Sequence, residues 1–119
     1  METAEAEADV VQALGALAHP LRLQVYRALV VAGNRGLTPG VMQEGLGIPA
    51  TTLSFHLKEL ALAGLVTVER SSRHSIYRAA FERLERVLRY LTENCCNGAP
   101  CGLRVDPGAC GPRPNGGPR

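Results

Sequence analysis

The sequence is poor in aromatic residues and contains no tryptophan. Its 119 residues include two phenylalanines and three tyrosines, although 45% of the chain is hydrophobic. A core with so few rings must be small and aliphatic, and a chain of this length normally forms a single domain. We therefore expect one small domain that covers its remaining apolar surface with a second copy of the chain.

A long apolar run and a basic leader are also missing. No stretch reaches the ~18 consecutive apolar residues that a membrane span requires. The first nine residues carry four acids, where a signal peptide would be basic. These absences predict a cytoplasmic protein with no membrane partner. In that reducing compartment clustered thiols are expected to be ligands or sensors rather than disulfides, and the chain has four within sixteen residues: Cys95, Cys96, Cys101 and Cys110.

Acidic residues become scarce after the N-terminus. Residues 10–89 hold nine arginines and Lys58 against five glutamates, so this stretch carries +5 in a chain whose total is +2. A basic body of this size suits a polyanion such as DNA, while a solvated arginine-rich surface is the alternative.

The groups that enzymes use are absent as well. We find no paired carboxylates in a plausible cleft, no Ser/His/Asp arrangement and no glycine-rich phosphate loop. We expect neither enzymatic activity nor a catalytic cofactor.

The spacing of apolar residues predicts five helices and one β-hairpin. Prolines at helix starts and glycines at helix ends set the bounds near 5–18, 20–32, 39–46, 50–63 and 81–92. Two alternating segments within residues 65–79 form the hairpin, with a polar turn at 71–74. The predicted fold is mainly α with a β-hairpin, a homodimeric winged helix-turn-helix over residues 1–96. A flexible glycine- and proline-rich tail follows over residues 97–119.

A winged helix-turn-helix places its second helix in the major groove and its hairpin on the flanking backbone. Turning Leu53, Leu57 and Leu60 toward the core sends Thr51, Phe55, Lys58 and Leu62 to the opposite side, with Thr52, Ser54 and Glu59 beside them. Two alternatives stay open: Phe55 folded back on the domain, and His56 hydrogen-bonded to neighbouring backbone. The candidate DNA contacts are Thr51, Thr52, Ser54, Phe55, His56 and Lys58 in this helix, with Arg70 and Arg73 in the hairpin.

Three segments resemble the ArsR/SmtB family of metal-responsive repressors: LAHPLR at residues 17–22, LSFHLKEL at 53–60 and AGLV at 63–66. The resemblance covers about residues 8–96. It implies a homodimeric repressor whose first and last helices form the dimer interface. Such a repressor binds a two-fold-symmetric, double-stranded operator until an inducer weakens the complex.

Members of this family differ in where they bind their inducer. The Cys-Val-Cys motif of the founding type of arsenic sensor is absent, because residues 38–52 contain no cysteine, and the last helix has no histidine for a zinc or nickel site. The adjacent Cys95 and Cys96, with Cys101 after them, are similar to an arsenite-responsive subgroup with three thiolates at the end of the last helix.

The chemistry of the thiols agrees with that placement. Trivalent arsenic and antimony are soft, commonly three-coordinate centres that prefer thiolates. We therefore expect As(III) or Sb(III) as the inducer, bound by Cys95, Cys96 and Cys101. The alternatives are another thiophilic metal, including tetrahedral zinc with Cys110 as fourth ligand, a disulfide-based redox switch, and a winged-helix domain that binds protein instead of DNA.

Overall fold

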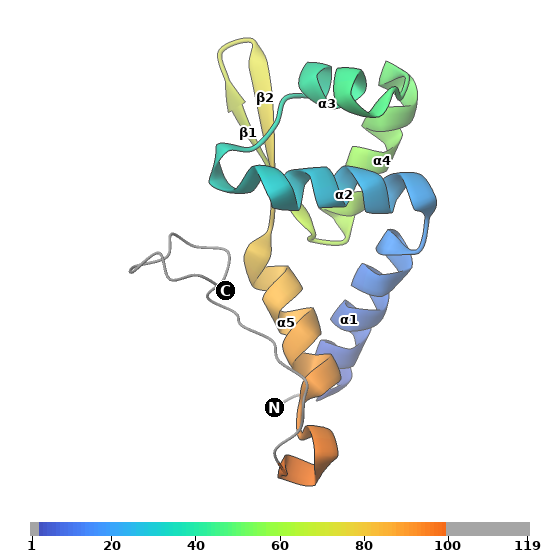
Figure 1. The fold of residues 1–119 in the computed structure, drawn as a ribbon, viewed down its shortest axis with the longest axis vertical. Helices are drawn as coiled ribbons and strands as arrows, with labels where there is room; N and C mark the ends of the chain where they lie inside the picture. The colour runs from blue at the N-terminus through green and yellow to red at the C-terminus, as the bar shows by residue number, and fades with distance from the viewer. Residues whose placement is uncertain (1–2, 100–119) are drawn as a thin grey trace.

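Helix α2 crosses the middle of the molecule and separates two ends that present different elements (Figure 1). The computed structural model describes residues 3–99. One end holds α3, α4 and the hairpin, and at the other end α1 and α5 run side by side. The elements in chain order are α1 (Thr3–Leu17), α2 (Pro20–Ala32), η1 (Gly33–Arg35), α3 (Pro39–Leu46), α4 (Ala50–Leu62), β1 (Val66–Ser71), β2 (His74–Ala79), α5 (Phe81–Thr92) and η2 (Cys95–Gly98).

This order confirms the predicted winged helix-turn-helix, mainly α with one antiparallel hairpin. Helix α5 has the bounds expected from its apolar spacing, and the other helix and strand bounds lie within two residues of the prediction. The 3-10 turn η1, which follows α2, was not predicted. No helix in the described part of the chain is both long and apolar enough to cross a membrane.

Local sequence signals explain where the helices of the helix-turn-helix begin and end. Thr38 caps α3, because its Oγ1 accepts a hydrogen bond of 3.4 Å from the Val41 amide. Gly47 ends α3 with φ +66° and ψ +35°, a left-handed conformation that costs glycine little. His19 caps α2 through a hydrogen bond of 3.1 Å from the Leu21 amide to its Nδ1 atom, a role that the sequence analysis did not predict.

The core is aliphatic, as the scarcity of rings predicts. Tyr26 is the only phenylalanine or tyrosine among the buried residues of the described chain. Burial of each large aliphatic side chain stabilises the fold by about 1.5–3 kcal/mol. The stability of the core is therefore the sum of contributions from several helices rather than from one aromatic cluster. The largest fully buried side chains of the core are Val25, Leu29, Met42, Leu53, Leu60 and Leu65.

The hairpin is joined to the helix-turn-helix by a backbone bridge. Leu37, just before α3, exchanges two hydrogen bonds with Tyr77 of β2: its amide donates at 2.9 Å and its carbonyl accepts at 2.8 Å. The preceding Gly36 has φ +71°, and a Cβ atom there would lie 2.7 Å from the Tyr77 carbonyl oxygen. Only glycine fits this close approach without displacement, and the bridge fixes the wing to the start of α3.

Candidate nucleic-acid interface

The outer face of α4 carries most of the predicted contact residues. Leu53, Leu57 and Leu60 are buried against the domain, as expected. The apolar spacing of the helix also predicts Ala61 on this face, but Ala61 is exposed. The side chains on the opposite face are short hydroxyls, one aromatic ring and one ammonium group, with only Thr52 half-buried: Thr51, Thr52, Ser54, Phe55 and Lys58.

His56 is a correction to the predicted set of DNA contacts. It is only 4% exposed, and its Nδ1 atom accepts a hydrogen bond of 3.1 Å from Nε of Arg22 in α2. Three to four residues from Leu53 and Leu60, its position in α4 turns the ring toward α2 rather than toward solvent. The partner is therefore a side chain, not the neighbouring backbone that the sequence analysis held open, and the ring joins two helices.

Phe55 points outward, which resolves the alternative that the sequence left open. Its side chain is 53% exposed, and the guanidinium carbon of Arg22 lies 5.5 Å from the ring centroid. A cation at this distance over an aromatic face is attracted by the ring quadrupole. Arg22 thus contacts both Phe55 and His56, a role that no sequence pattern indicated, because residues 22 and 56 are far apart in the chain.

The surroundings of His56 favour its neutral form. Burial lowers the pKa of His56 from its ordinary value of 6.5, and the nearby His19 and Arg22 lower it further, while Glu59 has the opposite effect. The His19 and His56 ring centroids lie 4.7 Å apart. The ring is consequently neutral near pH ~7, which is the state that accepts the hydrogen bond from Arg22.

The wing presents exposed arginines at and near its tip. Ser72, with φ +59°, and Arg73 form the turn between the strands. Arg70 and Arg73 are exposed as predicted, and Nη1 of Arg70 donates a hydrogen bond of 2.9 Å to Oγ of Ser75. Arg78 instead anchors the wing, since it donates 2.7 Å hydrogen bonds to the Asn34 carbonyl and the Glu69 carboxylate.

The first turn of α4 leaves its backbone amides without a side-chain cap. Pro49 precedes the helix and offers no capping side chain. Amides in the first turn of a helix have no partner within the helix and, with the helix dipole, favour an anion. The start of α4 therefore suits a phosphate beside the hydroxyls of Thr51 and Thr52.

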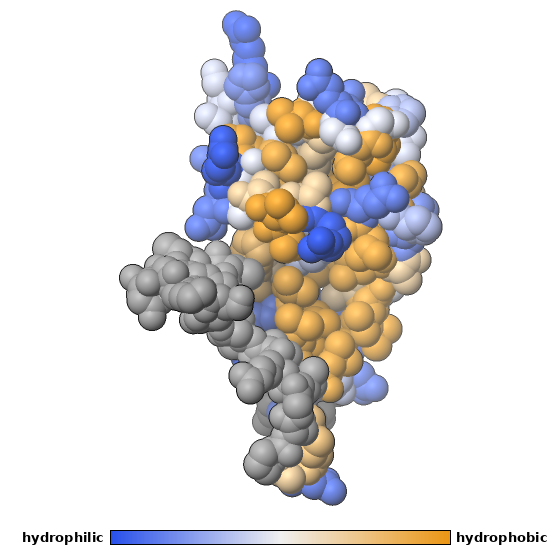
Figure 2. Space-filling model, viewed as in Figure 1, coloured by the Kyte–Doolittle hydropathy of each residue, from blue (hydrophilic) through white to orange (hydrophobic). Residues whose placement is uncertain are grey.

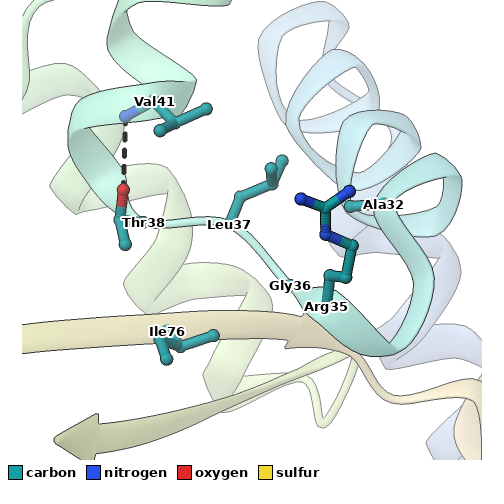
Figure 3. Close-up of a pocket in the computed structure, with 7 residues that line it drawn as sticks. All are labelled: Ala32, Arg35, Gly36, Leu37, Thr38, Val41 and Ile76. Carbon is teal, nitrogen blue, oxygen red and sulfur yellow. Dashed lines mark hydrogen bonds between the residues drawn. The ribbon is translucent and has the colours of Figure 1, made fainter.

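A hollow of about 420 Å³ lies between the end of α2, the start of α3 and β2 (Figure 3). Apolar side chains make most of its lining, and the Arg35 side chain lies beside them. It contains none of the residues predicted as functional. Its lining residues are Ala32, Arg35, Gly36, Leu37, Thr38, Val41 and Ile76.

Cys95 and Cys96 come directly after α5, where the chain leaves the helical path. Helix α5 ends at Thr92, and Asn94, Cys96 and Asn97 have φ between +54° and +58°. Asparagine tolerates this left-handed conformation better than most residues. Cys95 is half-buried and Cys96 is exposed. Within residues 3–99 no three histidine, cysteine or acidic side chains gather as a metal site; Cys101 and Cys110 lie outside the described residues.

The opposite end of the molecule exposes apolar side chains on α1 and α5. Figure 2 shows hydrophobic groups over this end, below the mainly hydrophilic wing and a helix-turn-helix surface of mixed character. The apolar spacing of α5 predicts a stripe of Phe81, Leu84, Leu88 and Leu91 that packs against another helix. Phe81 and Leu84 pack on the core, while Leu88 and Leu91 are exposed; Val87, outside that stripe, is buried. The exposed apolar residues of the two helices are Val11, Leu14, Leu88 and Leu91.

Comparisons with known proteins agree with this geometry. Residues 17–69 match the family described as a helix-turn-helix domain. An ArsR-like transcriptional regulator from Rhodococcus sp. RHA1 is 22% identical over 77% of this chain and 84% of its own, with a TM-score of 0.67. The repressor BigR from Xylella fastidiosa is 26% identical over 77% of this chain and 93% of its own, with a TM-score of 0.58.

A third neighbour is the homodimeric winged helix-turn-helix DNA-binding domain of Mb0332 from Mycobacterium bovis. It is 24% identical over 85% of this chain and 94% of its own, with a TM-score of 0.61. No curated protein matches the sequence significantly. The fold and the exposed face of α4 define a winged helix-turn-helix protein. Among such proteins, its fold is that of the ArsR-like transcriptional regulators.

Proposed function

We propose that this protein is a homodimeric transcriptional repressor that binds operator DNA and releases it when As(III) or Sb(III) binds Cys95, Cys96 and Cys101. The observation that carries the DNA-binding part is the outer face of α4. It presents Thr51, Ser54, Phe55 and Lys58 to solvent on the same end of the molecule as the wing.

This surface has the chemistry that a DNA duplex requires. Hydroxyl groups and uncapped amides at the start of α4 suit phosphates or base edges, and Phe55 suits a thymine methyl group. Lys58, Arg70 and Arg73 supply positive charge along the groove and the flanking backbone. The similarity to BigR, which is described as a transcriptional repressor, supports repression as the outcome of binding.

Dimerisation follows from the apolar surface at the other end. Leu88 and Leu91 of α5 and Val11 and Leu14 of α1 are exposed in the protomer. A second copy that covers them by two-fold symmetry places two α4 helices on one face of the assembly, as a two-fold-symmetric operator requires. The homodimeric state of the Mb0332 domain supports this arrangement.

The inducer site rests on the thiols after α5. Adjacent cysteines on a regular helix point in different directions, but α5 ends before Cys95 and the left-handed residues around it turn the chain. Two neighbouring thiols in such a turn, with a third supplied by Cys101, match the three soft ligands of trivalent arsenic or antimony.

Coupling between this site and DNA runs through the dimer. Closing a thiolate site at the end of α5 changes the segment beside the apolar surface that spaces the two α4 helices. A coupling free energy of ~1–3 kcal/mol weakens operator binding about 5- to 150-fold, which is enough for derepression.

The experiment is a titration of the protein on the upstream region of its own gene. Fluorescence anisotropy measures binding, and arsenite, antimonite, zinc, cadmium and hydrogen peroxide are added in separate series. We expect release with arsenite and antimonite. Release by peroxide alone would favour a disulfide switch, release by zinc or cadmium alone another metal, and no binding to any DNA would favour a protein partner.

A further inference from the structure

Arg22 is held between a buried and an exposed ring of α4. Its Nε atom donates to Nδ1 of His56 at 3.1 Å, and its guanidinium carbon lies 5.5 Å from the centroid of Phe55. The rings of Phe55 and His56 are themselves 5.5 Å apart and inclined at 60°. One side chain from α2 thus connects the interior of the domain to the aromatic group on the outer face of α4.

From this geometry we propose that Arg22 is a positioning residue for the DNA-binding face of α4, and that acid releases it by placing a proton on His56. The inference rests on the proposed DNA-binding function. It assigns no contact with DNA to Arg22; the arginine acts through the orientation of Phe55 and the seating of α4 on α2.

The hydrogen bond from Arg22 to His56 determines which protonation state of His56 the contact between α2 and α4 requires. An arginine Nε–H group can only donate, so Nδ1 of His56 must carry a lone pair. The ring is therefore neutral, with its proton on Nε2. Nδ1 of His19 is likewise an acceptor, for the Leu21 amide at the start of α2.

Protonation of His56 turns this attractive contact with Arg22 into a repulsive one. A proton on Nδ1 removes the acceptor and sets two cations against each other. The charged and titratable groups that face His56 are Arg22 and His19 from the α2 side and Glu59 on α4 itself. Of these groups Glu59 favours a charged ring, and Arg22 opposes it, so protonation of His56 weakens the contact between α2 and α4.

The expected direction is opposite to the usual effect of acid on DNA binding. Protonated histidines add positive charge and ordinarily strengthen binding to phosphates. His74, exposed on the wing next to Arg73, is the position at which this general effect can be controlled for. Weaker operator binding at low pH therefore distinguishes a broken Arg22–His56 contact from a general charge effect.

The test compares operator affinity of the full-length protein at about pH 7.5 and about pH 5.5, with circular dichroism as a check on folding. For the parent protein we expect weaker binding at the lower pH, by less than tenfold, because the lowered pKa of His56 leaves only part of the rings protonated there. His56→Asn keeps an acceptor near the Nδ1 position but does not titrate. It should bind like the parent at the higher pH and lose the weakening at the lower pH.

Two further variants separate positioning from a merely structural role. Arg22→Lys keeps the charge but not the planar Nε–H donor, so it should bind about tenfold more weakly at the higher pH and show little additional weakening in acid. His74→Gln, the matched control on the wing, should keep the acid weakening of the parent.

The outcomes also separate this inference from the proposed function. Binding by the parent that is unchanged or stronger in acid, with the fold intact, would overturn this inference alone. This inference alone would also be overturned if the His56→Asn protein still bound the operator more weakly at the lower pH. Absence of operator binding at both pH values would overturn the proposed function and this inference with it.

Discussion

Arg86 of α5 donates a hydrogen bond of 3.2 Å from Nη2 to Oδ2 of Asp9 in α1. Arg83, one turn earlier, places its Nη1 atom 3.8 Å from the other oxygen of the same carboxylate. Asp9 belongs to the acidic N-terminal segment and the arginines to the basic body. The opposite charges of these two segments therefore form ion pairs within one protomer. Such partly exposed pairs add at most about 1 kcal/mol, but they set α1 against α5.

The first prediction concerns dimerisation. Leu88→Glu combined with Leu91→Glu should yield a folded monomer that no longer binds operator DNA, because both side chains are exposed in the protomer, at 37% and 56%, and the carboxylates would be buried between subunits. Leu84 is a poorer choice for this test, since it packs on the core. Sedimentation measures the mass.

The matched control is Val31→Glu. Val31 lies on α2 and is 74% exposed, away from α1 and α5, so the variant should remain dimeric. A parent chain that sediments as a monomer at micromolar concentration would contradict the proposed interface.

The second prediction separates phosphate contacts from base contacts. Arg73→Ala should weaken binding to operator and random DNA alike and reduce the salt dependence of the affinity by about one phosphate contact. Ser54→Ala should instead reduce the preference for operator by about 1–3 kcal/mol. Anisotropy titrations on both DNAs at several salt concentrations provide the comparison.

Arg89→Ala serves as the control for charge. Arg89 lies on α5, pairs with Glu85 at 2.9 Å and is remote from the wing, so its loss should leave the salt dependence unchanged. If Ser54→Ala lowered the affinity for operator and random DNA equally, this would contradict the assignment of α4 as the recognition helix.

The third prediction concerns the inducer. Cys95→Ser, Cys96→Ser and Cys101→Ser should each retain operator binding but no longer release DNA with arsenite, because each removes one of three thiolates. Cys110→Ser should respond like the parent protein. If Cys110→Ser fails to respond while Cys101→Ser responds normally, the third ligand is misassigned, and a parental response in all four variants would place the sensor elsewhere.

The fourth prediction concerns the bridge between wing and helix-turn-helix. Gly36→Ala should lower the free energy of unfolding by about 1–3 kcal/mol, since its Cβ atom would lie 2.7 Å from the Tyr77 carbonyl oxygen and from Cγ2 of Ile76, at a φ of +71°. Urea denaturation measures the change.

Gly45→Ala is the matched control within α3. No heavy atom lies within 4 Å of the Cβ position at Gly45, and alanine is the better helix former, so the variant should be more stable by about 0.5–1 kcal/mol. A Gly36→Ala protein as stable as the parent would mean that the bridge tolerates displacement.

Predictions that depend on local sequence agree with the structure. Pro20, Thr38 and Pro39 lie at helix starts, Gly47 and Gly64 have the positive φ expected after helices, and α5 begins and ends where its apolar spacing places it. Each of these signals acts through the conformational preference of one residue or its hydrogen bond to a near neighbour. The helix-turn-helix and its wing are therefore readable without tertiary information.

The sequence did not predict which apolar face of α5 packs against the core. The period of α5 is compatible with a stripe through either Leu88 or Val87, and only the position of α1 beside it decides that Val87 is buried and Leu88 exposed. Val87 and Leu88 are adjacent residues, so each lies on one of two neighbouring apolar stripes of the helix.

The contacts that shape the candidate site were decided by tertiary structure. Arg22 meets His56 and Phe55, Leu37 meets Tyr77, and Asp9 meets Arg86 across separations of 33 to 77 residues. Helical and strand periodicity places a side chain on a face but does not name the residue opposite it. The five long helices, the hairpin, their order and the outward position of Thr51, Ser54, Phe55 and Lys58 were predictable from the sequence, whereas the turn η1 was not. The packing of α2 against α4 alone decided that His56 is a buried acceptor for Arg22, because only that packing removes the ring from water and supplies its donor.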